Sequence, residues 1–548
     1  MARWFATSLV GFAAGLLFPA LAVAAEHKLG PDPAAKCAGI KADAPVSIDS
    51  ATIVPAVPFA VAERGPTPTA RITPATPEFC RVLGRIAPVD PKAPPIRFQV
   101  NLPLAWNGRT VQYGGGGFNG VLITGVGLPP SAPLDSASPL AQGYVTYGTD
   151  SGHETKPGEA PQQFALNDEA LVNFSHAAYK KVRDVAVMLV ERAYSAKPEK
   201  LYFLGTSEGG REGVTMAQRY PDSFDGIFAR VPVLNWTLLQ HVGTRDGIAL
   251  MGDGWLRPAQ VKLVHDAVLA ACDAQDGIAD GLVADPVGCK KRFNIAKLQC
   301  AAGASGDQCL SAAQVNAAKT LGTNYRLPFP LANGVRDYPG RGPSGEGAND
   351  GWPLWWLGSA PPAIPLQPAT NSRAWLFGAG AIQYFYVRDP DYDVRKYSAK
   401  DHAKRVQEVS ALMDATNPDL SAFRKRGGKL IIVEHMADYA QSPYAGIAYF
   451  LSVEKKMGAA AVGSFARLYT APGVDHSAAG AAPANVDMLK VLTDWVENGK
   501  APGNLVVTQQ AAANPVVTDR AVPLCQWPLW PRYKSGDVKK AESFACGK

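Results

Sequence analysis

The residues best suited to covalent chemistry lie in one stretch, residues 201–211 (LYFLGTSEGGR). Gly205, Ser207 and Gly209 follow the pattern G-x-S-x-G between an apolar run and a segment with helical spacing. Glycines have no Cβ, so they permit the close backbone approach that a serine in a strained strand-to-helix turn requires. The N-terminus of the next helix would direct N–H groups at an oxyanion formed during acyl transfer. The pattern predicts a nucleophile, Ser207; a glycine-rich turn with a capping serine is the alternative reading.

A nucleophilic serine needs a base, and the base needs a carboxylate to orient it. After an elbow of this kind the acid and the histidine follow in that order, in loops after later strands. Asp438 follows the apolar run 428–434, and His476 follows the apolar run 465–470. We therefore predict that Asp438 and His476 act with Ser207.

Other residues compete for these two roles. His435 is the main alternative base, and Asp475 is an alternative acid. Asp475 is disfavoured because a carboxylate next to the histidine in sequence seldom reaches its Nδ1. His153 is disfavoured because it precedes the serine, whereas the expected chain order places the histidine last.

Four glycines, residues 114–117, directly follow a predicted strand at 110–113. Such a loop can point backbone N–H groups at a ligand oxygen, although a merely flexible glycine loop is the alternative. We predict that an amide in this loop and the amide of Glu208 bind the oxyanion. The candidate donors in the loop are Gly115, Gly116 and Gly117.

These residues need strands and helices to hold them in place. Apolar runs alternate with segments of helical periodicity, which predicts an α/β fold, specifically an α/β-hydrolase fold with a large inserted lid domain. The expected strands are 96–102, 110–113, 143–150, the run before the elbow, 224–233, 428–434 and 465–470. The expected helices are 177–194, 210–220, 443–457 and 484–498.

The chain divides into four segments. Residues 1–25 have a basic start, an apolar run and an A-x-A site, which predicts a cleaved signal peptide rather than a membrane anchor. Residues 26–234 would form the first part of the hydrolase core with an N-terminal extension. Residues 235–425, rich in proline and tryptophan, break the alternation and are predicted to form the lid. Residues 426–548 would complete the core and end in a tail.

Composition limits the partners. The 548 residues carry a net charge of only +6, without a run of lysines and arginines, so nucleic acid is not an expected partner. No stretch after the signal is apolar and long enough to span a bilayer. The mature protein is expected to be exported, to the periplasm or beyond. The four lid tryptophans (Trp352, Trp355, Trp356 and Trp375) are more often core residues than a ring-binding platform.

An even number of cysteines in an exported chain suggests disulfides, and no C-x-x-C pair favours a metal-thiolate site. Their clustering in sequence suggests that neighbours pair. The expected disulfides are Cys37–Cys80, Cys272–Cys289, Cys300–Cys309 and Cys525–Cys546.

A second cluster lies in the predicted lid, at residues 272–282. Asp273, Asp276 and Asp280 are interleaved with glycines and must either repel one another or share a cation. Oxygen ligands in a glycine-bearing loop suit Ca²⁺, although the loop lacks the bidentate glutamate of an EF-hand. A solvated acidic loop is the alternative.

Taken together, these stretches resemble the tannase/feruloyl esterase family, which also includes bacterial mono(2-hydroxyethyl) terephthalate hydrolase. The resemblance covers nearly the whole mature chain. It implies that Ser207, Asp438 and His476 form the triad. It also implies a structural calcium bound by the side chains of Asp273, Asp276 and Asp280 and by the carbonyls of Ile278 and Leu282. The stretches that carry it are 113–120, 143–153, 205–211, 220–227, 272–281 and 471–476.

The chain departs from the family at two positions. The family usually has a cysteine before the serine and another after the histidine, joined as a disulfide; here these positions are Thr206 and Ser477. A hydrogen bond between Thr206 and Ser477 would contribute only about 1 kcal/mol across the same gap.

The expected function is that of a secreted serine esterase acting on aromatic-acid esters of the feruloyl, galloyl or terephthaloyl monoester type. Two alternatives remain at this point. The first is a binding protein of the same fold without catalysis, and the second is a peptidase.

Overall fold

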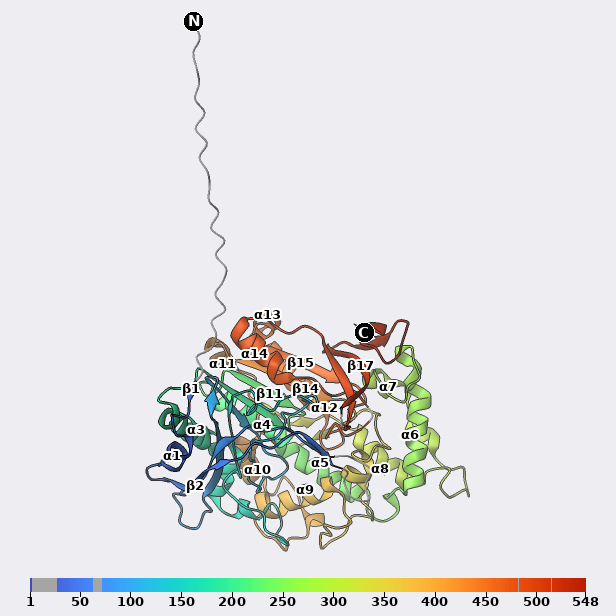
Figure 1. Ribbon diagram of the computed structural model, residues 1–548. Coiled ribbons are helices and arrows are strands. Elements are labelled where there is room, and N and C mark those ends of the chain that lie inside the picture. The colour runs from blue at the N-terminus through green and yellow to red at the C-terminus, as the bar shows by residue number, and fades with distance from the viewer. Residues whose placement is uncertain (2–26, 63–70, 481, 514) are drawn as a thin grey trace.

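The computed structural model describes Met1 and residues 27–62, 71–480, 482–513 and 515–548 (Figure 1). The predicted signal peptide, from its second residue onward, lies outside the described residues. No helix in the described part of the chain is long and apolar enough to cross a membrane.

Six parallel strands form the centre of an eleven-stranded sheet. Because they are parallel neighbours, their carboxyl ends lie along one edge, where the sequence places the candidate site. Their side chains are almost entirely buried, which explains the continuous apolar runs in the sequence. In spatial order they are β9 (Val145–Thr149), β8 (Arg109–Tyr113), β10 (Lys200–Thr206), β11 (Gly226–Arg230), β14 (Lys429–His435) and β15 (Ala466–Ala471).

Antiparallel strands extend the sheet on both sides. Beyond β9 lie β6 (Ile96–Pro103), β5 (Phe79–Ile86) and β2 (Val46–Val54). Beyond β15 lie β17 (Val517–Gln526) and β16 (Leu505–Ala511), which come from the C-terminal tail. The tail therefore joins the sheet as a hairpin.

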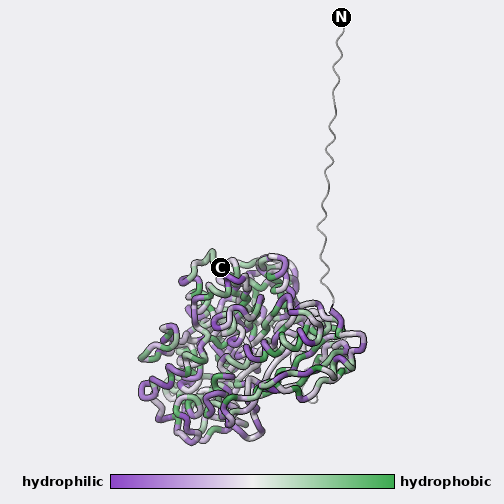
Figure 2. The backbone as a smooth tube through the Cα atoms, turned by 90° about the vertical axis from the view of Figure 1, so that its left-hand side faces the viewer, coloured by the Kyte–Doolittle hydropathy of each residue, from purple (hydrophilic) through white to green (hydrophobic). Residues whose placement is uncertain are grey.

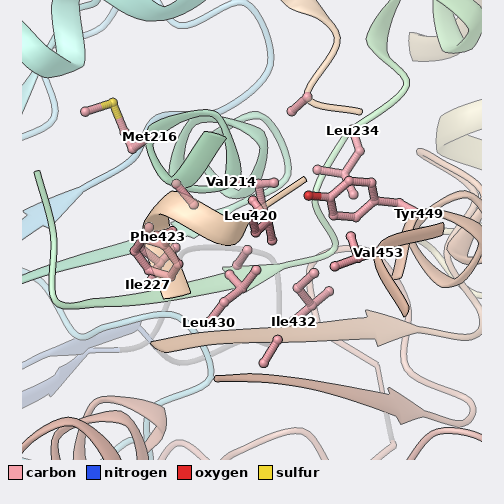
Figure 3. Close-up of a cluster of buried hydrophobic side chains, with 14 of the residues drawn as sticks. Val214, Met216, Ile227, Leu234, Leu420, Phe423, Leu430, Ile432, Tyr449 and Val453 are labelled. Carbon is pink, nitrogen blue, oxygen red and sulfur yellow. The ribbon is translucent and has the colours of Figure 1, made fainter. Parts of the chain in front are cut away.

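Helices cover both faces of the sheet, and the alternation of strand side chains shows how. Phe203, Ile227 and Ile432 point to one face, where they pack with α4 (Glu208–Arg219) and α12 (Pro443–Met457). Figure 3 shows Ile227 and Ile432 in this cluster, with Val214 of α4 and Val453 of α12. The sequence neighbours of those three strand residues, Leu204, Phe228 and Ile431, point to the other face. There they pack with α14 (Met488–Asn498). Helix α3 (Ala178–Tyr194) lies on the same face as α4, nearer β6, since Tyr179 packs with Phe203 and the rest of α3 packs against β6.

Three helices start at positions other than those predicted. The helix expected at 177–194 starts earlier, because α2 (Asp168–Val172) and a π-helical segment (Asn173–Ala177) run directly into α3. Helix α4 begins at Glu208 rather than at 210, because the turn at Ser207 leads directly into it. Helix α14 begins at Met488 rather than at 484. The residues before α14 are held extended, since the backbone of Asn485 exchanges two 2.9 Å hydrogen bonds with that of Thr508.

A large insertion separates β11 from β14 and lies below and to the right of the sheet in Figure 1. It has apolar clusters of its own, so hydrophobic residues are spread through sheet and insertion alike (Figure 2). Its last helix, α11, packs Phe423 against Leu430 and Ile432 of the sheet. Its helices are α5 (Trp236–Ala249), α6 (Pro258–Cys272), α7 (Pro286–Arg292), α8 (Ala312–Gly322), α9 (Arg373–Ala381), α10 (Ala403–Met413) and α11 (Ser421–Lys425).

The four predicted disulfides are confirmed. Cys37–Cys80 ties the N-terminal helix α1 (Pro33–Ala38) to β5, and Cys525–Cys546 closes the tail. Cys272–Cys289 joins α6 to α7, and Cys300–Cys309 closes a short loop before α8. Each bridge is local, so each braces an edge of the molecule rather than the centre of the sheet.

Candidate active site

Ser207 occupies a strained turn between β10 and α4. Its φ of 60° and ψ of −120° lie outside the regions that a non-glycine residue ordinarily adopts. The flanking glycines are sterically required. A Cβ on Gly205 would lie 2.1 Å from the carbonyl oxygen of Gly209, and a Cβ on Gly209 would lie 2.7 Å from that of Gly115. This geometry matches the predicted elbow, with Ser207 half-buried at its tip.

Asp438 and His476 are directly hydrogen-bonded. Nδ1 of His476 lies 2.7 Å from Oδ2 of Asp438, and both side chains are buried. The other carboxylate oxygen of Asp438 accepts the amides of Ala440 at 2.7 Å and Gln441 at 3.1 Å. The acid is therefore held by three hydrogen bonds. A proton on Nδ1 leaves Nε2 of His476 as the basic nitrogen.

The sheet brings these residues to one edge. Ser207 directly follows β10, Asp438 lies in the loop after β14, and His476 lies in the loop after β15. The three strands run parallel in the same sheet, with only β11 between β10 and β14. The strand order thus brings Ser207 to the same edge as Asp438 and His476, which follow it by more than 200 positions in the sequence.

The alternative residues have other partners. Nδ1 of His435 lies 2.6 Å from the backbone carbonyl of Asp475, and burial, with help from the nearby charge of Arg230, holds the pKa of His435 well below its usual value. The Asp475 carboxylate accepts the amide of Ala479 at 3.1 Å. The geometry thus favours His476 with Asp438 over either competitor.

His153 supports the glycine loop. Its Nε2 lies 2.8 Å from the carbonyl oxygen of Phe118, and its ring stacks on Phe164 at a centroid distance of 3.8 Å. Burial lowers the pKa of His153 to about 4, so it is neutral near pH 7. Its role in this structure is to hold Phe118, which follows the four glycines.

The glycine loop approaches the elbow, and its amides differ in what they bind. The amide of Gly115 donates to Glu212 at 3.0 Å, and that of Gly116 donates to the side chain of Asn119 at 2.7 Å. Within the described ranges, the amide of Gly117 has no acceptor. Glu208 is the first residue of α4, so its amide has no acceptor within the helix. Of the predicted donors, Gly117 and Glu208 are the two left free for an oxyanion.

A buried charge network behind the elbow did not feature in the sequence analysis. The fully buried guanidinium of Arg211 bonds Glu208 at 2.8 Å, the carbonyl of Ser175 at 2.8 Å and that of Met413 at 3.1 Å. Burial raises the pKa of Glu208 to about 7, and Arg211 offsets part of this effect. Met413 ends α10, so the network joins the elbow to the insertion. The charged residues Glu208, Arg211 and Glu212 at the start of a helix that directly follows a buried strand were the available signal.

Aromatic side chains of the insertion line the site. The Trp355 ring meets the His476 ring edge to face at 5.2 Å, and Phe377 lies 6.1 Å from Trp355. Nε1 of Trp355 donates to Asp350 at 2.6 Å. The exposed guanidinium of Arg373 lies 5.5 Å from the centre of the Trp355 ring. All four tryptophans are buried in the clusters of the insertion, and Trp355 is the one of them that packs against the ring of His476.

Thr206 and Ser477 bind different partners in this structure. Oγ1 of Thr206 accepts a 3.0 Å hydrogen bond from Nε of Arg230. The amide of Ser477 donates to the second oxygen of Asp350 at 2.7 Å. The suggested hydrogen bond between Thr206 and Ser477 is not formed in the described structure: the Thr206 hydroxyl binds Arg230, and Asp350 holds the backbone of Ser477.

The acidic loop was predicted to bind calcium. Its oxygen donors fit that ion in kind, and the pKa of Asp276 is raised to about 6 by burial and by the nearby carboxylates of Asp280 and Asp273. In this structure Asp273 accepts the amides of Asp280 at 3.0 Å and Gly281 at 2.9 Å, and Asp280 pairs with Arg520. Across the described residues, no three acidic, histidine or cysteine side chains are gathered to hold a metal. Calcium, with Ile278 and Leu282 as carbonyl ligands, stays a prediction.

The fold is shared with solved esterases. The structure superimposes on an esterase from Aspergillus oryzae with a TM-score of 0.76 at 22% identity, covering 94% of this chain and 99% of that one. Feruloyl esterase B from the same organism gives a TM-score of 0.75 at 24% identity and the same coverage. At these identities the comparison shows an α/β-hydrolase fold.

Sequence relatives define the class. An uncharacterised esterase of Agrobacterium fabrum is 38% identical over 86% of this chain and 85% of its own length. The mono(2-hydroxyethyl) terephthalate hydrolase of Piscinibacter sakaiensis is 33% identical over 88% of this chain and 87% of its own. A probable feruloyl esterase of Arthroderma benhamiae is 32% identical over 82% of this chain and 81% of its own. The protein is a carboxylic ester hydrolase.

The particular family follows from a match over most of the chain. The family model described as tannase and feruloyl esterase matches residues 80–547. The chain belongs to the tannase and feruloyl esterase family, as its motifs predict.

The choice between the two histidines can be tested by matched substitutions. We expect His476→Asn to lower kcat on p-nitrophenyl acetate by about 10³-fold or more, because the general base is lost. His435→Asn keeps an amide that can donate to Asp475, so we expect a loss below about tenfold. Circular dichroism of both variants controls for folding. The reverse ranking would identify His435 as the base.

Calcium binding is tested by the melting temperature. If the loop binds the ion, EGTA should lower the melting temperature by about 2 °C or more, and added CaCl₂ should restore it. Asp276→Asn should abolish this dependence. Asp266→Asn, which removes an exposed carboxylate on the neighbouring α6, should retain it. Identical melting curves of the parent in EGTA and in calcium would exclude the site and leave the Asp280–Arg520 pair as the brace.

Proposed function

We propose that the protein is an exported serine esterase that hydrolyses esters of aromatic acids through Ser207, His476 and Asp438. The single observation that supports it most is the 2.7 Å hydrogen bond between His476 and Asp438 at the sheet edge where Ser207 turns out of β10. This is the arrangement that a serine nucleophile requires of its base and acid.

In the proposed reaction, Nε2 of His476 takes the proton of Ser207 as its Oγ attacks the ester carbonyl. The amides of Gly117 and Glu208 stabilise the oxyanion, and the strained turn presents the hydroxyl without a further rearrangement. His476 then protonates the leaving alcohol. Water hydrolyses the acyl-enzyme, with the same imidazole as base. Asp438 stays ionised throughout and stabilises the imidazolium.

The proposed acyl group is aromatic. Trp355 lies against His476, and Phe377 adjoins Trp355, so an apolar wall stands next to the base. The names of the relatives point the same way, to feruloyl and terephthaloyl esters. Galloyl esters belong to the same proposed class. A flat ring bound at this wall would place its ester beside Ser207.

Export is part of the proposal. Four disulfides and no free cysteine in the described chain suit an oxidising compartment, such as the periplasm or the extracellular space. The signal-like segment at residues 1–25 would direct the chain there.

A hydrolysis panel tests the reaction and the acyl group. The substrates are methyl ferulate, methyl gallate, mono(2-hydroxyethyl) terephthalate and p-nitrophenyl acetate. We expect the parent to hydrolyse at least one aromatic ester, and Ser207→Ala to lose about 10³-fold or more in kcat because the nucleophile is removed. Turnover that survives in folded Ser207→Ala would contradict the proposal. An inactive parent that a fluorophosphonate does not label would favour a non-catalytic binding protein.

Substitution of the exposed Arg373 tests whether the site prefers a substrate that carries a negative charge. Terephthalate monoester carries a carboxylate on the far side of its ring, whereas methyl ferulate does not. If the monoester is a substrate, Arg373→Ala should lower its kcat/KM by about tenfold, the effect of one partly exposed ion pair, and change that for methyl ferulate by less than about twofold. Arg395→Ala, which alters an exposed arginine paired to Asp393, is the control. Equal losses on both esters would show that Arg373 does not select for charge.

A further inference from the structure

One half-buried cation lies among the three catalytic loops without belonging to the triad. Arg230 is the last residue of β11, the strand between the serine strand β10 and the acid strand β14. In the ladders, Arg230 stands opposite Thr206 on one side and Val433 on the other. Its side chain therefore starts at the centre of the edge where the site is built.

The backbone around Arg230 is tightly held. Its carbonyl accepts the amide of Ser207 at 2.9 Å, and the next amide, that of Val231, donates to Val433 at 2.7 Å. Val231 has a φ of +42°, a conformation that a β-branched residue rarely adopts. A Cβ on Gly210 would lie 2.9 Å from the Arg230 carbonyl. This close packing prevents the arginine from moving away from the elbow.

The guanidinium touches the serine loop directly and acts on the acid and histidine loops through its charge, while its Nη1 donates to Oγ of Ser131 at 3.4 Å. Its Nε donates to Thr206, the residue before Ser207, at 3.0 Å. Arg230 makes no direct ion pair with a carboxylate of the described residues, so its charge acts on Asp438 and Asp475 through space. Burial lowers the pKa of Arg230 to about 10, and these two carboxylates offset part of that effect.

The carboxylates need such a charge. The pKa of Asp475 is raised by burial and by the neighbouring Asp350 and Asp438, so three like charges converge on the loops that carry His476 and Asp438. Arg230 is the arginine whose field acts on Asp438, on Asp475 and on His435 beside them. A fixed cation offsets the mutual repulsion of the carboxylates and keeps their loops close together.

We propose that Arg230 is the positioning residue of this site: it anchors the serine turn through Thr206 and balances the carboxylates of the acid and histidine loops. The proposal rests on the proposed triad and gives Arg230 no contact with the substrate. Catalysis is sensitive to such positioning, because a misplacement of about 1 Å can cost on the order of 10²-fold in rate.

The test compares Arg230→Met, Arg230→Lys and Thr206→Val with the parent, using kcat per serine titrated with a fluorophosphonate. We expect Arg230→Met to lower kcat by about 10- to 100-fold with KM changed less than about twofold, because substrate is not contacted. Loss of the cation removes a positive charge that lowers the pKa of His435 and that disfavours protonation of the groups around it. The acidic limb of the kcat profile should therefore move to higher pH by about one unit.

The other two variants separate charge from hydrogen bonding. Arg230→Lys keeps the positive charge, so the acidic limb of its kcat profile should stay at the pH seen in the parent. Its kcat should still fall, by less than in Arg230→Met, because lysine lacks the Nε that donates to Thr206. Thr206→Val removes only the acceptor, so kcat should fall without a shift of the limb. Arg426→Met is the matched control: Arg426 pairs at 2.8 Å with Asp225, at the opposite end of β11, and its loss should leave kcat and the profile unchanged.

An active parent with an unchanged profile and kcat in Arg230→Met would overturn the role of Arg230 and leave the proposed function intact. An inactive parent would overturn both. If Arg230→Met does not fold, the proposal depends on the other two variants. A kcat equal to the parent's in both Arg230→Lys and Thr206→Val would then contradict the proposal. A lower kcat in both variants, without a shift of the acidic limb, would support it.

Discussion

The close backbone contact beneath Ser207 is the constraint on which the rest of this structure depends. The turn from β10 to α4 packs against the glycine loop on one side and against the end of β11 on the other, at distances where any Cβ would clash. This contact explains the glycines at positions 205, 209 and 210. It also holds the glycine loop directly against the start of α4, since the amide of Gly209 donates to the carbonyl of Gly115 at 3.2 Å. A strained conformation of this kind persists only where the surrounding structure determines it fully.

Buried charges surround this contact and connect it to the insertion. On one side, Arg211 joins the elbow helix to the end of α10 through Met413. On the other side, Asp350 of the insertion binds both Trp355 and the amide after His476. The insertion therefore contributes to the structure of the site itself. Its polar groups hold the histidine loop, and its aromatic side chains form the wall beside the imidazole.

This chain departs from the family pattern at positions 206 and 477, where threonine and serine replace the two cysteines of the family's usual disulfide. The structure has a different arrangement there, because Thr206 bonds Arg230 and the Ser477 amide bonds Asp350. Both contacts involve a charged group, and such hydrogen bonds are about twice as strong as neutral ones. They remain reversible, however, so the rigidity of the site depends on the packing around them.

Local sequence patterns determined much of this protein. The G-x-S-x-G motif, the apolar runs of the parallel strands and the order of Ser207, Asp438 and His476 predicted the fold and the candidate triad. The spacing of the cysteines predicted all four disulfides. Each of these signals depends on neighbours in the chain. Only the tertiary structure decided what depends on distant residues: that Trp355 faces His476 while the other lid tryptophans are core, that His153 supports a loop, and that Arg230 lies among the three catalytic loops. The physical reason is that strand order, rather than sequence distance, sets which side chains share the edge of a parallel sheet.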